Sequence, residues 1–199
     1  MRVHECLIRL AWLAVVVAGA VEAAFPRELD YCPDSRERVA AVSEPDRTDG
    51  PGNAGPMSPA TTASICLLVE SAAQAHGLPL EFFARLIWQE SRFNPDAVGP
   101  ATRSGQRAQG IAQFMPDTAK ERSVLDPFDP VVALPKSAEL LHELRTQFGN
   151  LGLAAAAYNA GPKRVREWLA GRGSLPGQTR NYVSAITGRS ADDWVHSHK

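Results

Sequence analysis

The chain of 199 residues has no excess of charge of either sign, because 21 basic side chains balance 22 acidic ones and leave a formal net charge of -1. Binding to phosphate backbones depends on a surplus of Lys and Arg, so this balance argues against a general nucleic-acid binder. Histidine and cysteine are also scarce. His196 and His198 lie in a polar tail, and two histidines alone are a weak signal for metal binding. We therefore predict neither a metal site nor a cofactor.

Long apolar runs are missing as well. Residues 10–21 are continuously apolar and follow a basic start that contains Arg2 and Arg9, but a helix that spans a bilayer needs about 20 such residues. Val21 and Ala23 fit the -3 and -1 positions of a secretory cleavage site. We expect a signal peptide over residues 1–23 and a periplasmic or secreted protein with no transmembrane anchor after cleavage, rather than a buried N-terminal helix.

Two cysteines remain once a signal peptide containing Cys6 is removed, namely Cys32 and Cys66. In an oxidising compartment such a pair would form a disulfide that ties the N-terminal arm to the first helix of the domain. Two unpaired thiols are the alternative, which we favour less because export makes an idle exposed thiol a liability.

The organisation of the rest of the chain follows from its periodicity. Residues 24–60 form an arm that ends in a linker rich in Pro and Gly, without apolar periodicity. Beyond it the pattern predicts one mainly α domain over 61–188, with no strand, and a tail over 189–199. The expected helices cover about 61–76, with Thr61 or Thr62 as cap, then 79–93, 116–122, a helix through 140–148 that Pro135 either starts or kinks, 151–158, 162–170 and 178–187.

Glu90 is the first candidate for chemistry. It lies three residues after Ile87 and seven after Phe83, which places it beside the buried face of its helix. Partial burial and the negative end of the helix both disfavour ionisation, so its pKa is expected to rise toward the range of a general acid. On position alone, a solvated glutamate paired with Arg85 or Arg92 is the commoner arrangement.

Two further positions are polar in apolar surroundings. Gln113 interrupts a short apolar run, and the pair Tyr158 and Asn159 closes an Ala-rich helix. Amide and phenol groups suit recognition of a neutral, hydroxyl-rich ligand such as a sugar, because they donate and accept hydrogen bonds. Capping of helix ends and turns is the alternative, and spacing alone does not choose between the two.

Four short motifs follow one another along the predicted domain. They are Glu90-Ser91 with Phe93-Asn94-Pro95, then Gly110-Ile111-Ala112-Gln113-Phe114-Met115-Pro116, then Ala157-Tyr158-Asn159-Ala160-Gly161-Pro162, and last Thr179-Arg180-Asn181-Tyr182-Val183. In order and spacing they resemble the catalytic domain of the soluble lytic transglycosylases, over about residues 78–188. The resemblance implies a lysozyme-like, mostly helical fold with an active-site cleft, and peptidoglycan glycan strands as substrate.

The resemblance also implies roles for single residues and a reaction. The enzyme would cleave the β-1,4 bond between N-acetylmuramic acid and N-acetylglucosamine without water and leave a 1,6-anhydro sugar. A hydrolytic muramidase and a non-catalytic glycan-binding or assembly module stay open as alternatives, as does a cell-envelope-spanning assembly as a further partner. The implied site comprises Glu90 as the single acid and base, Gln113 and Met115 along the cleft, Tyr158 and Asn159 near the reacting sugar, and Tyr182 facing the same cleft.

The sequence departs from the family pattern in three places. Gly99 stands where many members have a serine that contacts the glycan, Gln178 stands where a glutamate is expected, and the loop over residues 99–110 is longer than is typical. Arg92, Arg103 and Arg107 flank or lie in this loop, where they would either steer substrate carboxylates or be plain solvated charges.

Overall fold

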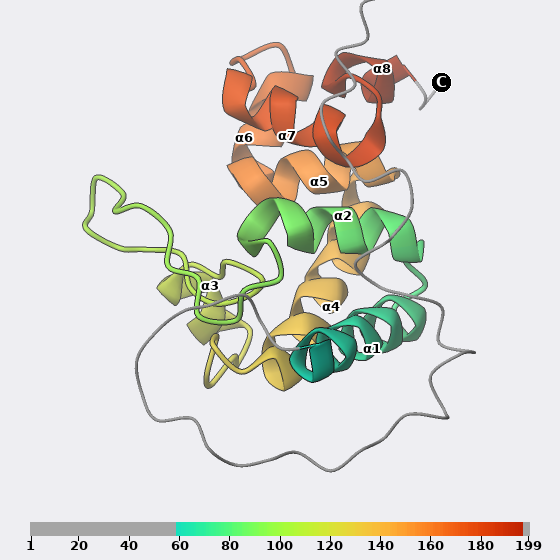
Figure 1. The fold of residues 1–199 in the computed structure, drawn as a ribbon. Coiled ribbons are helices and arrows are strands. Elements are labelled where there is room, and N and C mark those ends of the chain that lie inside the picture. Colours follow the sequence, from blue (N-terminus) through green and yellow to red (C-terminus); the bar gives the residue numbers. More distant parts are fainter. Residues whose placement is uncertain (1–58, 197–199) are drawn as a thin grey trace, which may run out of the picture. The chain divides into compact units, whose positions relative to one another are not determined.

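The computed structural model describes residues 59–196, and within this range every regular element is a helix (Figure 1). Isolated bridges link Val98 to Gln109 and Gln109 to Phe114. The predicted signal peptide, most of the arm, Cys32 and His198 lie outside the described residues. The helices are α1 (Pro59–Ala75), α2 (Leu80–Ser91), α3 (Pro116–Glu121), α4 (Pro130–Phe148), α5 (Leu151–Ala160), α6 (Pro162–Leu169), α7 (Gly177–Thr187) and α8 (Ala191–His196).

Several helix ends differ from the prediction. α1 begins at Pro59, so Thr61 and Thr62 lie inside the helix and neither caps it. α5 continues to Ala160 and ends at Gly161, whose φ of 86° only glycine adopts readily. Asn159 is therefore the penultimate residue of a helix and does not belong to the turn that breaks it. Pro135 lies inside α4, which starts at Pro130.

α8 was not predicted, because its six residues carry no apolar periodicity of their own. Its Trp194 lies against Gly152 of α5, where an added Cβ would come within 2.1 Å of the indole Cγ. The Asn150 side chain donates to the carbonyl of Trp194 at 2.9 Å, and the indole N–H donates to Thr187 Oγ1 at 3.1 Å. Docking onto α5 and α7 therefore replaces intrinsic helix preference as the reason why this segment folds.

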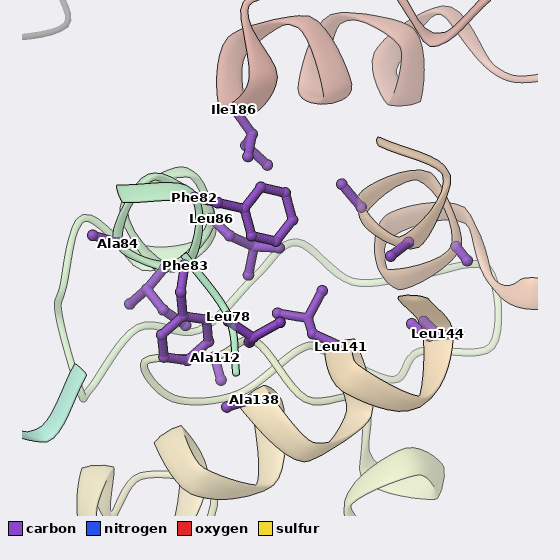
Figure 2. Packing of buried hydrophobic residues seen from close by; sticks show 14 of the residues in the cluster. Leu78, Phe82, Phe83, Ala84, Leu86, Ala112, Ala138, Leu141, Leu144 and Ile186 are labelled. Atoms are coloured by element: carbon purple, nitrogen blue, oxygen red, sulfur yellow. The ribbon is translucent and has the colours of Figure 1, made fainter. Parts of the chain in front are cut away.

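The core joins α2, α4, α5 and α7. α5 packs against α4, α6, α7 and α8, while α2 packs against α1 and α7 (Figure 1). The four alanines at 154–157 are all buried, and their small side chains let the neighbouring helices approach closely. Figure 2 shows Phe82 of α2 pointing toward Ile186 of α7, with Leu141 of α4 below. This packing fixes α2 and α7, the two helices that bring Glu90 and Tyr182 together.

The segment between α2 and α3 forms a narrow hairpin that extends away from the helices (Figure 1). The N–H of Gly99 donates to the carbonyl of Ala108 at 2.9 Å, and the N–H of Thr102 donates to Gln106 at 2.8 Å. Within residues 59–196, no helix is both long and apolar enough to cross a bilayer.

Candidate active site

Glu90 lies in the last turn of α2, at the edge of the face that buries Phe83 and Ile87. The side chain is half-buried, and loss of solvent raises its pKa from 4.5 to about 7, although a hydrogen bond from Tyr182 works in the opposite direction. The predicted rise of this pKa is confirmed. At neutral pH a large fraction of this carboxyl group is therefore protonated and able to donate a proton.

Glu90 does not form the commoner arrangement, an ion pair with a neighbouring arginine. Arg85 forms an ion pair with Glu81, on the turn before it. The guanidinium of Arg92 lies over the ring of Trp88, 4.8 Å from its centroid. No ion pair of the described residues includes Glu90, which leaves burial as the dominant influence on its charge.

Tyr182 on α7 reaches Glu90 directly, since its hydroxyl donates to Oε1 of the carboxyl group. The ring is buried, with 6% of its surface exposed. Burial, the charge of Glu90 and this hydrogen bond all raise the pKa of the phenol well above its ordinary value. Tyr182 therefore stays protonated and serves as a permanent donor to Glu90. The family resemblance implied that Tyr182 faces the same cleft, but it did not indicate this contact.

Tyr158 lies near the end of α5 and connects the site to the loop before α3. Its hydroxyl donates to the carbonyl of Ala112 at 2.8 Å. Burial, and after it the charge of Glu90, raise the pKa of this phenol well above the usual range. Two protonated phenols thus lie within electrostatic reach of Glu90, and they come from different helices.

Asn159 follows on α5 and is exposed, with a partner that sequence reasoning missed. The hydroxyl of Thr179, on the first turn of α7, donates to the side-chain oxygen of Asn159 at 2.8 Å. Thr179 is 2% exposed, and it lies one turn before Tyr182 on the same helix face. The three-residue spacing of Thr179 and Tyr182 could have indicated this hydrogen bond. It places Thr179 on the same helix face as a site residue, and a buried hydroxyl there needs a polar partner.

Gln113 holds the loop together through its side chain. Its Nε2 donates to the carbonyls of Ala97 at 3.1 Å and Gly110 at 2.9 Å, while its backbone has a φ of 50° in the left-handed region. Its Oε1 points at Gly99, where an added Cβ would lie only 2.9 Å away. Glycine at position 99 therefore has a structural reason, since a side chain there would displace the Gln113 amide.

The remaining predicted residues lie around this centre. Met115 is half-buried and precedes the first residue of α3, and Gln178 is exposed in the first turn of α7. Cys66 is buried on α1, but Cys32 lies outside the described residues, so their pairing stays a prediction. Arg107 donates to the carbonyl of Gly99 at 2.9 Å, which gives it a role in shaping the hairpin.

The class of protein follows from a helical fold that brings a half-buried glutamate and two tyrosines together. The fold is similar to that of an inactive mutant of the lytic transglycosylase Slt from Pseudomonas aeruginosa, with a TM-score of 0.52 and 31% identity over 66% of this chain and 24% of that one. It is also similar to the 70-kDa soluble lytic transglycosylase of Escherichia coli, with a TM-score of 0.52 and 28% identity over 65% of this chain and 24% of that one. The predicted mainly α, lysozyme-like fold is confirmed.

The Transglycosylase SLT domain family model matches residues 68–181, more than half of the chain, and the chain belongs to this family. It is 30% identical over 122 residues to a transglycosylase of Enterobacteria phage PRD1, covering 61% of this chain and 44% of the relative. It is 32% identical over 131 residues to the soluble lytic murein transglycosylase of Escherichia coli strain K12, covering 55% and 20%. The chain thus spans less than half of the length of these relatives.

Proposed function

We propose that this chain is an exported lytic transglycosylase, which cleaves the β-1,4 bond between N-acetylmuramic acid and N-acetylglucosamine in peptidoglycan. One feature carries the proposal: Glu90 is half-buried, has a pKa of about 7 and accepts a hydrogen bond from Tyr182. Such a carboxyl group can donate a proton near neutral pH and take one back afterwards. Membership of the SLT family supports this choice of substrate.

Glu90 would act twice in the reaction. It first gives its proton to the glycosidic oxygen while the bond between C1 of the muramyl sugar and that oxygen breaks. The resulting carboxylate then takes the proton of the muramyl C6 hydroxyl, as the C6 oxygen forms a bond to C1. The product is a 1,6-anhydro sugar, no water is consumed, and Glu90 regains its proton. One carboxyl group therefore suffices where most glycosidases use two.

The surrounding residues support both protonation states. Tyr182 donates to Oε1 of Glu90, so Oε2 is the oxygen available to the substrate, and the hydrogen bond stabilises the carboxylate between the two proton transfers. Tyr158 and Asn159, together with the N-acetyl group of the substrate, would stabilise the positive charge that develops at C1. Gln113 and Met115 would line the glycan cleft.

The product identifies the reaction. We would incubate the full chain with purified peptidoglycan in water enriched in ¹⁸O and identify the new sugar ends by mass spectrometry. The proposal predicts 1,6-anhydromuramyl ends without ¹⁸O. Reducing ends that carry ¹⁸O would identify a hydrolytic muramidase instead, and a chain that binds glycan but releases nothing would be a binding or assembly module.

Export is the second part of the proposal, and it rests on residues 1–23. Cleavage after Ala23 would give a periplasmic or secreted chain that starts at Ala24 and carries a disulfide between Cys32 and Cys66. N-terminal sequencing of protein recovered from outside the cytoplasm tests the cleavage. An unchanged mass after denaturation and alkylation without reductant supports the disulfide, whereas a gain of two alkyl groups contradicts it.

A further inference from the structure

The hydroxyl of Thr179 is a buried donor whose partner lies on another helix. Thr179 is in the first turn of α7, so no carbonyl of the same helix lies four residues before it to accept its proton. The hydroxyl instead donates to Oδ1 of Asn159, near the end of α5, at 2.8 Å. Thr179 is 2% exposed, whereas Asn159 is exposed. The contact therefore joins a fixed hydroxyl group of the core to an amide at the surface.

This contact decides which atoms of Asn159 remain for a ligand. A side-chain amide has an oxygen that accepts hydrogen bonds and a nitrogen with two protons to donate. Because Oδ1 faces the Thr179 hydroxyl, Nδ2 is the end left over, and no hydrogen bond within residues 59–196 includes it. Asn159 therefore offers a ligand two N–H groups, which suit an acceptor oxygen and not another donor.

α7 relates this amide to Glu90. Tyr182 lies three residues after Thr179 on the same face of α7, and its hydroxyl donates to Oε1 of Glu90. Side chains at this spacing are neighbours on a helix, with about 5–6 Å between their Cβ atoms. Adjacent turns of one helix thus hold the acid from α2 and the amide from α5. The separation of Glu90 and Asn159 is set through α7, although neither residue belongs to it.

We propose that Thr179 is a positioning residue for Asn159, and that it holds the amide with its N–H groups toward the sugar beside Glu90. The proposal rests on the proposed lytic transglycosylase activity. Thr179 is buried and touches no substrate, so it acts only through Oδ1 of Asn159. An amide in this orientation cannot stabilise a positive charge directly. Asn159 would help at C1 by binding an acceptor oxygen of the sugar, a hydroxyl or the N-acetyl carbonyl, and so holding the ring in place.

Thr179→Val and Thr179→Ser separate positioning from packing. Valine keeps the shape of threonine without the hydroxyl, while serine keeps the hydroxyl without the methyl group. In Thr179→Val the exposed amide can turn, so kcat/KM on peptidoglycan should fall about fivefold, the equivalent of one neutral hydrogen bond. Thr179→Ser should retain the kcat/KM of the wild type, and urea unfolding shows that both variants are folded in the assay. Full activity of a folded Thr179→Val variant would overturn the proposal.

Asn159→Ala provides an arm that leaves the core untouched. Asn159 is exposed and alanine favours helix, so this variant should fold like the wild type. It should lose at least as much kcat/KM as Thr179→Val, and Thr179→Val should cause no further loss in this background. An unchanged kcat/KM in Asn159→Ala, or the same fivefold loss from Thr179→Val in both backgrounds, would show that Thr179 does not act through the amide.

Asn159→Asp tests the orientation of the amide. Aspartate has nearly the same shape and can still accept the Thr179 proton, but it offers the sugar a second oxygen in place of the N–H groups. An added negative charge shifts the pKa of a nearby carboxyl group, so each variant is compared at its own pH optimum. We expect a loss of kcat/KM at least as large as that of Asn159→Ala. Wild-type kcat/KM would mean that the sugar needs an acceptor at this position, which contradicts the proposed orientation.

Binding separates this proposal from the proposed function. In the Glu90→Gln background soluble glycan strands stay intact, and their Kd is measured by isothermal titration calorimetry. Thr179→Val should raise this Kd about fivefold, and Thr179→Ser should leave it unchanged. If the wild-type chain released no product, the proposed function would fail, yet this difference in Kd would still support the role of Thr179. Equal Kd values for the two variants would overturn it.

Discussion

The hydroxyl of Tyr182 on α7 donates to Oε1 of Glu90 on α2, across 92 residues of sequence. Two opposing effects meet at this contact. Burial favours the neutral carboxyl group and raises its pKa, while the hydrogen bond favours the carboxylate and lowers it. Together the two effects leave the pKa of Glu90 near 7, so this one side chain can be both the acid and the base that the proposed reaction needs.

Tyr182→Phe removes the effect that lowers the pKa of Glu90 and leaves burial in place. The pKa should therefore rise, and the fall of kcat/KM at high pH should move toward higher pH by about one unit, the size expected for a hydrogen bond to a charged group. The measurement is kcat/KM against pH for wild type and variant. Tyr158→Phe is the control, since Tyr158 bonds to Ala112; a shift of the same size in the control would contradict this account.

Glu90→Gln should change the pH dependence of stability. The pKa of Glu90 is about 7 in the folded chain, against an ordinary value of 4.5, so the folded state holds the proton more tightly. This tighter binding of the Glu90 proton stabilises the folded state in full below pH 4.5, and the stabilisation is lost as the pH rises through 7. Glutamine cannot ionise, and the variant should gain up to about 3 kcal/mol over the wild type above pH 7, but nothing at pH 4. Urea unfolding from pH 4 to 8.5 tests this, and a constant difference between the two proteins would contradict it.

Gln113→Ala should loosen the loop between α2 and α3. The substitution removes two hydrogen bonds, to Ala97 and Gly110, and keeps the left-handed backbone of residue 113. We expect a loss of about 2 kcal/mol and faster amide exchange over residues 97–110. Gln106→Ala is the matched control, because Gln106 makes a single side-chain bond, to Asp117. Equal exchange in both variants would argue against a bracing role for Gln113.

Gly99→Ala tests why this position lacks a side chain. The new Cβ would lie 2.9 Å from Oε1 of Gln113 and 3.2 Å from Cβ of Ala108, so we expect a loss of about 1–2 kcal/mol. In the Gln113→Ala background the closer of these contacts is gone, and the loss should shrink. Strict additivity in urea unfolding would show that the two positions are not coupled.

Gly152→Ala should displace α8 from α5. An added Cβ would come within 2.1 Å of the Trp194 ring, a clash that outweighs the better helix propensity of alanine and should cost about 1–3 kcal/mol. Gly177→Ala, where a Cβ meets nothing within 4 Å, should be neutral or stabilising. The check is the thermal midpoint of the two variants, and equal midpoints would refute the proposed docking.

The helical fold and the place of Glu90 beside the buried face of its helix were predictable, because each depends on local patterns. Position alone favoured a solvated glutamate paired with an arginine, and only the resemblance of the four motifs to the soluble lytic transglycosylases assigned Glu90 the catalytic role. Apolar spacing along α2 places Phe83, Ile87 and Glu90 on adjoining faces of one helix, and Pro or Gly residues mark most helix ends. α8 could not be predicted in this way. It forms because Trp194 finds space over Gly152, a contact between residues far apart in sequence.

The side-chain hydrogen bonds within the candidate site could not be predicted from the sequence either. Tyr182 reaches Glu90, and Thr179 reaches Asn159, only because α7 packs beside α2 and α5. Gln113 looked like a sugar ligand, yet its amide nitrogen serves the loop. The motifs indicated which residues belong to the candidate site. Tertiary packing decides which polar atoms of those residues are used within the protein and which can still bind a ligand.

The most direct test of the central claim compares Glu90→Gln with Glu81→Gln on purified peptidoglycan. Both residues lie on α2, but Glu81 is exposed and paired with Arg85. We predict that Glu90→Gln stays folded and releases no anhydromuramyl ends above background, while Glu81→Gln releases them at the rate of the wild type. Release by a folded Glu90→Gln variant at the wild-type rate would contradict the assignment of Glu90 as acid and base.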